Sequence, residues 1–91
     1  MPYCGPLALD NAISAEAAKH KGIKSPVAGF ADILLMPNIE SGNVLYKALT
    51  YTTESKSGGL LLGANAPVVV TSRADSFESK VNSIAMAVLN A

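Results

Sequence analysis

The sequence has little of the material from which metal centres and disulfide scaffolds are built. Its 91 residues include one cysteine, one histidine and no tryptophan. Cys4 therefore has no partner for an internal disulfide bond. A structural zinc site needs several Cys or His ligands, which a chain of this composition cannot supply. We expect neither a disulfide framework nor a bound metal.

Charged residues are also scarce, and they balance. They make up 15% of the chain, seven basic and seven acidic, for a net charge of zero. No basic stripe is present that would attract nucleic acid or anionic lipid. The apolar stretches are interrupted at Gly63, Asn65 and Pro67, so none reaches the roughly 20 residues of a membrane span. The N-terminus lacks the pattern of a secretory signal. We expect a cytoplasmic location, without nucleic-acid or membrane partners.

Apolar residues, in contrast, are plentiful. They make up 49% of the chain, and the mean hydropathy is +0.30. A domain of this size leaves much of its surface exposed to water, so it cannot easily hide that many apolar side chains. We expect part of this surface to be buried against a partner or a missing half of the domain.

The apolar pattern predicts helices and strands in alternation, and therefore an α/β fold. Helices are expected near residues 10–20, 42–53 and 76–89, and strands near 31–36, 59–64 and 67–71. The strand at 31–36 is almost continuously apolar, as in a strand covered on both faces. The connection between the last two strands is too short for a crossover, so they are antiparallel neighbours or belong to different sheets.

The last helix has the clearest boundaries. Gly22 is expected to end the first helix, whereas Asp75 and Glu78 have the spacing of a capping box at the start of the last one. The segment 66–76 runs from a predicted buried strand through a polar turn into this helix. Ligands of α/β folds bind at such junctions. Here the junction carries the hydroxyl of Ser72 and the guanidinium of Arg73, which suit an anion.

Four short motifs resemble those of a known family. They are Gly5–Ser14 (GPLALDNAIS), Ser25–Gly29 (SPVAG), Gly42–Lys47 (GNVLYK) and Thr71–Asp75 (TSRAD). In this order and spacing they resemble the C-terminal third of the phosphate acetyl/butyryltransferases, and most of all the phosphate butyryltransferase branch. The four motifs cover almost the whole chain.

The resemblance implies a reversible transfer of an acyl group between coenzyme A and inorganic phosphate. It implies a three-layer α/β/α architecture, part of a fold like that of isocitrate and isopropylmalate dehydrogenases, with the active site between two domains of a dimer. Residues 1–66 would belong to the second domain and residues 67–91 would return to the first, whose N-terminal portion lies outside this chain. Acyl-CoA, coenzyme A and phosphate would be substrates, with no tightly bound cofactor.

The same resemblance assigns the site residues. Ser72 and Arg73 match the family's Ser-Arg pair and would bind the reacting groups, with Gly42 and Asn43 as further substrate-binding residues. Acetyltransferase members carry an Asp base six residues after the arginine, where this chain has Ser79. Asp75 or Glu78 could replace that base, although both also suit the structural task of capping a helix.

Two functions of different classes remain open. The chain can be part of a phosphate acyltransferase, inactive until the other wall of its cleft is supplied. Alternatively, it can be a non-catalytic oligomerisation or regulatory module, since the same fold occurs without transferase activity at the C-terminus of some malic enzymes. The Ser72–Arg73 pair favours the first reading, whereas the missing base favours the second.

Overall fold

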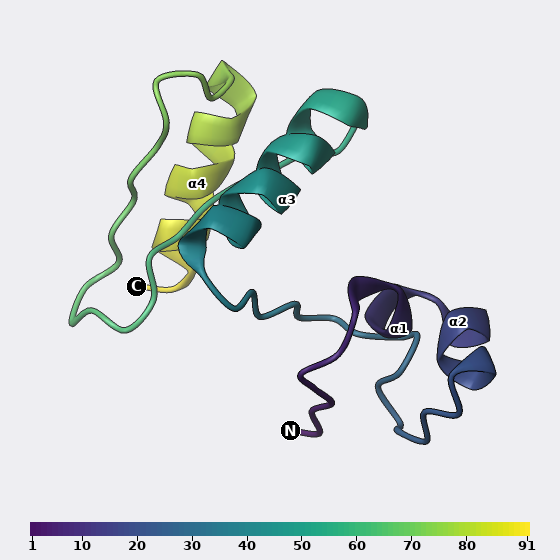
Figure 1. Ribbon diagram of the computed structural model, residues 1–91. Helices are drawn as coiled ribbons and strands as arrows, with labels where there is room; N and C mark the ends of the chain where they lie inside the picture. The colour runs from purple at the N-terminus through teal and green to yellow at the C-terminus, as the bar shows by residue number, and fades with distance from the viewer. The chain divides into compact units, whose positions relative to one another are not determined.

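The computed structural model describes all 91 residues and divides into two compact units, residues 1–37 and 38–91. The first unit contains the short helices α1 (Leu9–Ile13) and α2 (Ala15–His20), and the second contains α3 (Ile39–Thr52) and α4 (Phe77–Leu89), as Figure 1 shows. None of the four helices combines the length and hydropathy that a bilayer crossing requires.

Ser14 divides the helix that the sequence predicts over residues 10–20. Its backbone is extended, with φ −129° and ψ 112°, and its Oγ accepts a hydrogen bond from the N–H of Ala17 at 3.1 Å. A serine hydroxyl that caps a new helix competes with continuation of the old one. The prediction of one helix is therefore wrong at this residue, and α1 and α2 replace it.

The end of α2 lies where the sequence predicts it. Gly22 adopts φ +67°, and its N–H donates to the carbonyl of Lys19 at 3.0 Å. The N–H of Ile23 donates to the carbonyl of Ala18, also at 3.0 Å. This pair of bonds is the Schellman motif, which satisfies the last carbonyls of a helix and favours glycine at the left-handed position.

The loop after α2 folds back onto α1. The N–H of Gly29 donates to the carbonyl of Asn11 at 2.8 Å, and that of Ala31 donates to Ala12 at 3.1 Å. Gly29 has φ +86°, and a Cβ atom there would lie 2.4 Å from the Cα of Ala15. The chain can approach this closely only because the residue is glycine.

The second unit begins with a helix that is longer than predicted. Asn38 caps α3, because its Oδ1 accepts from the N–H of Ser41 at 2.9 Å, so the helix starts at Ile39 and not at residue 42. The last helix agrees with its prediction in extent. Its N-cap, however, is Ser76, whose Oγ accepts from the N–H of Ser79 at 3.1 Å. The prediction that Asp75 caps this helix within a capping box is wrong.

No strand forms in the three segments predicted to be strands. Residues 31–36 form no β-bridge, and an isolated antiparallel bridge joins Leu61 to Val68, with an N–O distance of 2.9 Å. The bridge agrees with the antiparallel alternative for the last two segments. A strand needs a neighbour to satisfy its backbone, and these segments offer one another too few partners. The three-layer arrangement is therefore not present in these residues alone.

Polar side chains attach the loop after α3 to α4. The N–H of Gly59 donates to Ser83 Oγ at 2.9 Å, and Asn82 Nδ2 donates to the carbonyl of Ser57 at 3.2 Å. Figure 1 shows this loop running beside α4. At Gly58 the loop backbone approaches α4 closely. A Cβ atom on Gly58 would lie 2.8 Å from the sulfur of Met86. Hydrogen bonds and a small residue thus help to hold this loop against the helix.

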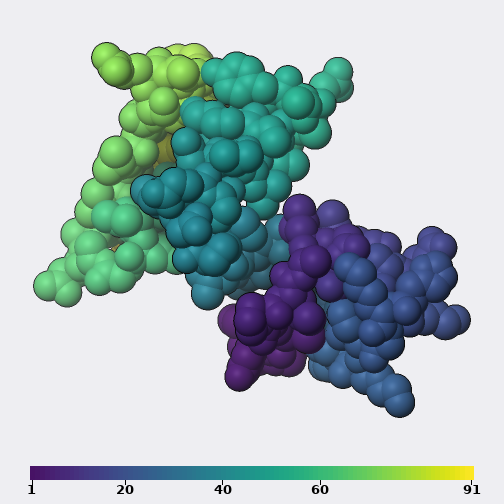
Figure 2. Space-filling view, viewed as in Figure 1, coloured from purple at the N-terminus to yellow at the C-terminus, as the bar shows by residue number.

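Few side chains are buried in either unit. Ala18 is the one buried apolar residue, and the others are polar: Asn11, Ser79 and Ser83. Large apolar side chains remain exposed on α1, α3 and α4, including Ile13, Val44, Phe77 and Val88. In the space-filling view, side chains of α3 and of the loop after it make up much of the visible face of the second unit (Figure 2). The apolar excess of the sequence is thus found at the surface.

Candidate functional site

The Ser72–Arg73 pair lies on an exposed turn directly before α4. The N–H of Asp75 donates to the carbonyl of Ser72 at 3.1 Å, which closes a four-residue turn. Within it, the N–H of Ala74 donates to Ser72 Oγ at 3.3 Å. The hydroxyl of Ser72 thus acts as an acceptor inside the turn, and its own proton can be donated outward. The Arg73 side chain forms no ion pair in this structure.

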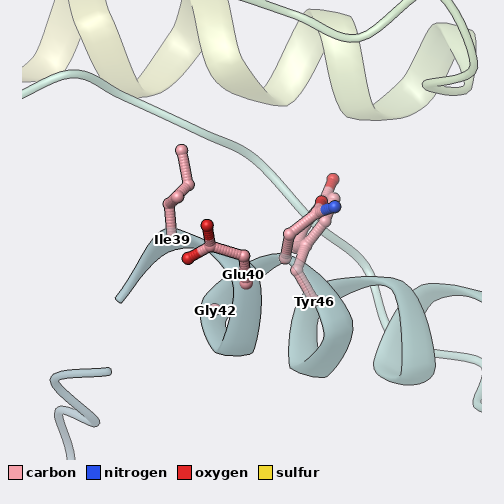
Figure 3. Close-up of a pocket in the computed structure, with 5 residues that line it drawn as sticks. Ile39, Glu40, Gly42 and Tyr46 are labelled. Atoms are coloured by element: carbon pink, nitrogen blue, oxygen red, sulfur yellow. The ribbon is translucent and has the colours of Figure 1, made fainter. Parts of the chain in front are cut away.

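Gly42 and Asn43 lie in the first turns of α3, where they line a shallow groove. The other lining residues are Ile39, Glu40 and Tyr46. Figure 3 shows the side chains of Ile39, Glu40 and Tyr46 on one side of the helix. Because Gly42 has no side chain, the groove floor there is backbone. The amide of Asn43 is exposed and can donate to a ligand in the groove.

A second, more polar groove joins α3 to the turn. Its lining residues come from α3, from the loop after it and from the start of α4: Tyr46, Lys47, Thr50, Tyr51, Ser55, Ser57, Ala74, Asp75 and Ser76. Tyr46 lines both grooves and thereby connects the Asn43 side of α3 with Asp75. Ser72 and Arg73 line neither groove, so the structure places Asp75 beside α3 but does not bring Ser72 and Arg73 together with Gly42 and Asn43.

Two residues of this region were not identified from the sequence. They are Tyr46, which lines both grooves, and Lys47, whose Nζ lies 5.4 Å from the centroid of the Tyr46 ring. That distance is within the range of a cation–π contact. The one available signal was spacing, because Tyr46 follows Asn43 by three residues and so lies on the same face of a helix.

The two candidate bases have different surroundings. Asp75 Oδ2 accepts a hydrogen bond from the N–H of Ser72 at 2.8 Å, so its carboxylate belongs to the turn. Glu78 lies in the first turn of α4, and its Oε1 is 3.6 Å from Lys56 Nζ in an exposed ion pair. Such a pair contributes little to stability. Ser79, at the position of the acetyltransferase Asp, is buried.

The turn before α4 presents an arginine fork and a hydroxyl donor, which suit a phosphate-bearing ligand. Comparison with known sequences points to proteins that act on such ligands. Residues 1–88 match the sequence model of the family described as Phosphate acetyl/butaryl transferase. The chain belongs to this family.

Individual relatives carry more specific names. The chain is 71% identical over 85 residues to a phosphate butyryltransferase of Clostridium acetobutylicum, covering 93% of this chain and 28% of that protein. It is 61% identical over 82 residues to a phosphate acetyltransferase of Thermotoga maritima, covering 90% of this chain and 28% of that protein. The chain thus spans less than a third of the length of these relatives.

A solved structure has a similar backbone. It is a branched-chain phosphotransacylase from Enterococcus faecalis, which matches with a TM-score of 0.79 and 51% sequence identity. The match covers 92% of this chain and 32% of that one. The fold described above therefore resembles about a third of a phosphotransacylase.

Proposed function

We propose that this chain supplies one wall of the active site of a phosphate acyltransferase, which reversibly transfers an acyl group between coenzyme A and inorganic phosphate. The observation that carries the proposal is the exposed turn that presents Ser72 and Arg73. It occurs in a chain that is 71% identical to a phosphate butyryltransferase. Acyl-CoA and phosphate are the substrates, and the enzyme acts in the cytoplasm.

The reaction needs a thiolate, donors for an oxyanion and a cation for phosphate. In the direction of thioester synthesis, the thiol of coenzyme A loses its proton to a base, and its sulfur attacks the carbonyl carbon of the acyl phosphate. A carbon–sulfur bond forms, the carbon–oxygen bond to phosphate breaks, and phosphate leaves. Arg73 can hold two phosphate oxygens at once with its planar fork. Ser72 and Asn43 can each donate one hydrogen bond to an oxygen of the reacting group.

The proposal also covers the architecture. Residues 1–66 would form part of one α/β domain and residues 67–91 part of another, in a three-layer fold. The segments 31–36, 59–64 and 67–71 would become strands when the remaining two thirds of the enzyme supply neighbours to pair with. The exposed apolar side chains of α3 and α4 would be covered in that assembly.

A non-catalytic oligomerisation or regulatory module is the second candidate. The observation that favours it is the burial of Ser79, which has no carboxylate to act as a base at the position where acetyltransferase members carry one. Under this reading the Ser72–Arg73 turn would bind an anion without chemistry.

Activity in a complete enzyme separates the two candidates. We define the chimera as the C. acetobutylicum phosphate butyryltransferase in which the 85 matched residues are replaced by those of this chain. The chimera should release coenzyme A from butyryl-CoA in the presence of phosphate, whereas the 91-residue chain alone should not. Arg73→Ala should lower kcat/KM by about 100-fold or more, the usual cost of losing one oriented donor.

Two further variants sharpen this test. Arg73→Lys should recover little, because a point charge does not reproduce the guanidinium fork. Lys24→Ala, which removes an exposed cation from the first unit, serves as the matched control and should keep parental rates. A chimera that folds and binds phosphate but never turns over would favour the regulatory module. Parental rates for Arg73→Ala would exclude the proposed role of that residue.

A further inference from the structure

Asp75 holds Ser72 from two sides. Its carboxylate Oδ2 accepts from the N–H of Ser72 at 2.8 Å, and its own N–H donates to the carbonyl of Ser72 at 3.1 Å. The side chain and the main chain of one residue thus bind both main-chain groups of the other. Arg73, between them, makes neither of these bonds, and its direction is set by the turn that they close.

The turn is also continuous with a fixed helix. Ser76 follows Asp75 directly and caps α4 through its Oγ. Within α4, Ser83 is 2% exposed and its Oγ accepts from the N–H of Gly59. The C-terminal side of the turn is therefore anchored by the helix. The position of Arg73 relative to that anchor depends on the Asp75–Ser72 bond.

We propose that Asp75 is a positioning residue for the Ser72–Arg73 pair and does not remove the proton of the thiol. The inference rests on the proposed function, because it concerns the same turn. An N–H donor bound to a carboxylate oxygen is a charge-assisted hydrogen bond and among the stronger kinds in proteins. If the Asp75 carboxylate rotated toward a thiol, it would break its bond to the N–H of Ser72, one of the two bonds that hold the turn, and so loosen the position of Arg73.

Three substitutions in the chimera separate positioning from proton transfer. Asp75→Asn keeps an acceptor oxygen at the same reach but cannot serve as a base. Asp75→Ala removes the acceptor, and Asp75→Glu keeps a carboxylate but moves it by one methylene. Positioning predicts a kcat/KM within about threefold of the parent for Asn, and a fall of about 10- to 100-fold for Ala and Glu, as a displacement of about 1 Å in a catalytic group produces.

The pH profile gives a readout that is independent of the size of these losses. For a positioning residue, the dependence of kcat/KM on pH should keep its shape in all three variants, and the KM for phosphate should rise in Asp75→Ala. A base predicts something different. Asn and Ala would then lose activity equally, and the acid limb of the profile would disappear. That result would overturn the inference, as would parental kinetics in Asp75→Ala.

Controls keep the result interpretable. Glu54→Gln and Glu54→Ala make matched changes at an exposed carboxylate after α3 and should leave kcat/KM unchanged. If Asp75→Ala does not fold by circular dichroism, the comparison of Asn with Glu decides, and higher activity for Glu contradicts positioning. Should Arg73→Ala abolish turnover while Asp75→Ala does not, the positioning role alone fails. Parental activity in Arg73→Ala would instead remove the proposed function of the turn.

Discussion

The hydroxyl oxygens of Ser57 and Ser79 lie 3.0 Å apart, and this contact joins the loop after α3 to the buried side of α4. Ser79 is 6% exposed. It stands where the family resemblance places a carboxylate base in acetyltransferase members. In this chain the position therefore holds a packed serine, and the proposed reaction would need a base at another position.

Ser83→Ala should destabilise the second unit. The Oγ of Ser83 accepts from the N–H of Gly59 and donates to the carbonyl of Ser79 at 2.8 Å. Without it the amide of Gly59 loses its partner, at a cost of about 1–2 kcal/mol in the free energy of unfolding. Urea unfolding of the chimera would show the change. Ser41→Ala, which removes one exposed hydrogen bond to the carbonyl of Asn38, should shift the midpoint far less.

The helices were predictable wherever their termination signals are local. Gly22 ends α2 and Ser76 begins α4 close to the predicted residues, because a left-handed glycine and a capping hydroxyl act within a few residues. Ser14 and Asn38 misled the prediction for a related reason. Either side chain can cap a helix or sit within a turn, and the sequence does not say which. The three predicted strands do not form here, because strand pairing depends on segments that are distant in the sequence.

Gly29→Ala should be far more costly than Gly22→Ala. Both residues have positive φ, but a Cβ atom at Gly29 would lie 2.4 Å from Ala15 Cα, whereas nothing lies within 4 Å of one at Gly22. We expect a loss of about 1–2 kcal/mol at Gly22 from backbone strain alone. At Gly29 strain and overlap should together cost about 3 kcal/mol or more. Equal unfolding midpoints for the two variants would contradict this account of the loop.

The ion pair between Asp10 and Lys21 should make the stability of the first unit fall at acid pH. The hydrogen bond from Lys21 Nζ, at 2.8 Å, holds the pKa of the Asp10 carboxyl below its ordinary value of 3.8. The stabilisation is therefore present above pH 3.8 and is lost as the pH falls through the lower pKa of the folded chain. Titration of Asp10 by NMR should show the lowered pKa, and Lys21→Gln should return it toward 3.8. Unchanged titration in Lys21→Gln would exclude the ion pair as the cause.

The candidate site was predictable in part. Ser72 and Arg73 follow a family motif and lie together on an exposed turn. The role of Asp75 in that turn was not predictable, since spacing fits a helix cap as well as a bond to Ser72. Tyr46 was missed because its place between the two grooves depends on how the loop after α3 approaches the helix.

The exposed apolar side chains of α4 should drive self-association of the isolated chain. Ile84, Val88 and Leu89 are 59%, 70% and 84% exposed, a surface that a soluble monomer rarely leaves uncovered. Sedimentation at low micromolar concentration should show dimers or larger species. The pair Ile84→Glu and Val88→Lys, spaced to preserve the helix, should shift the distribution toward monomer. Glu16→Lys, a charge change on α2, should leave it unaltered. A parental chain that sediments as a monomer would contradict the prediction.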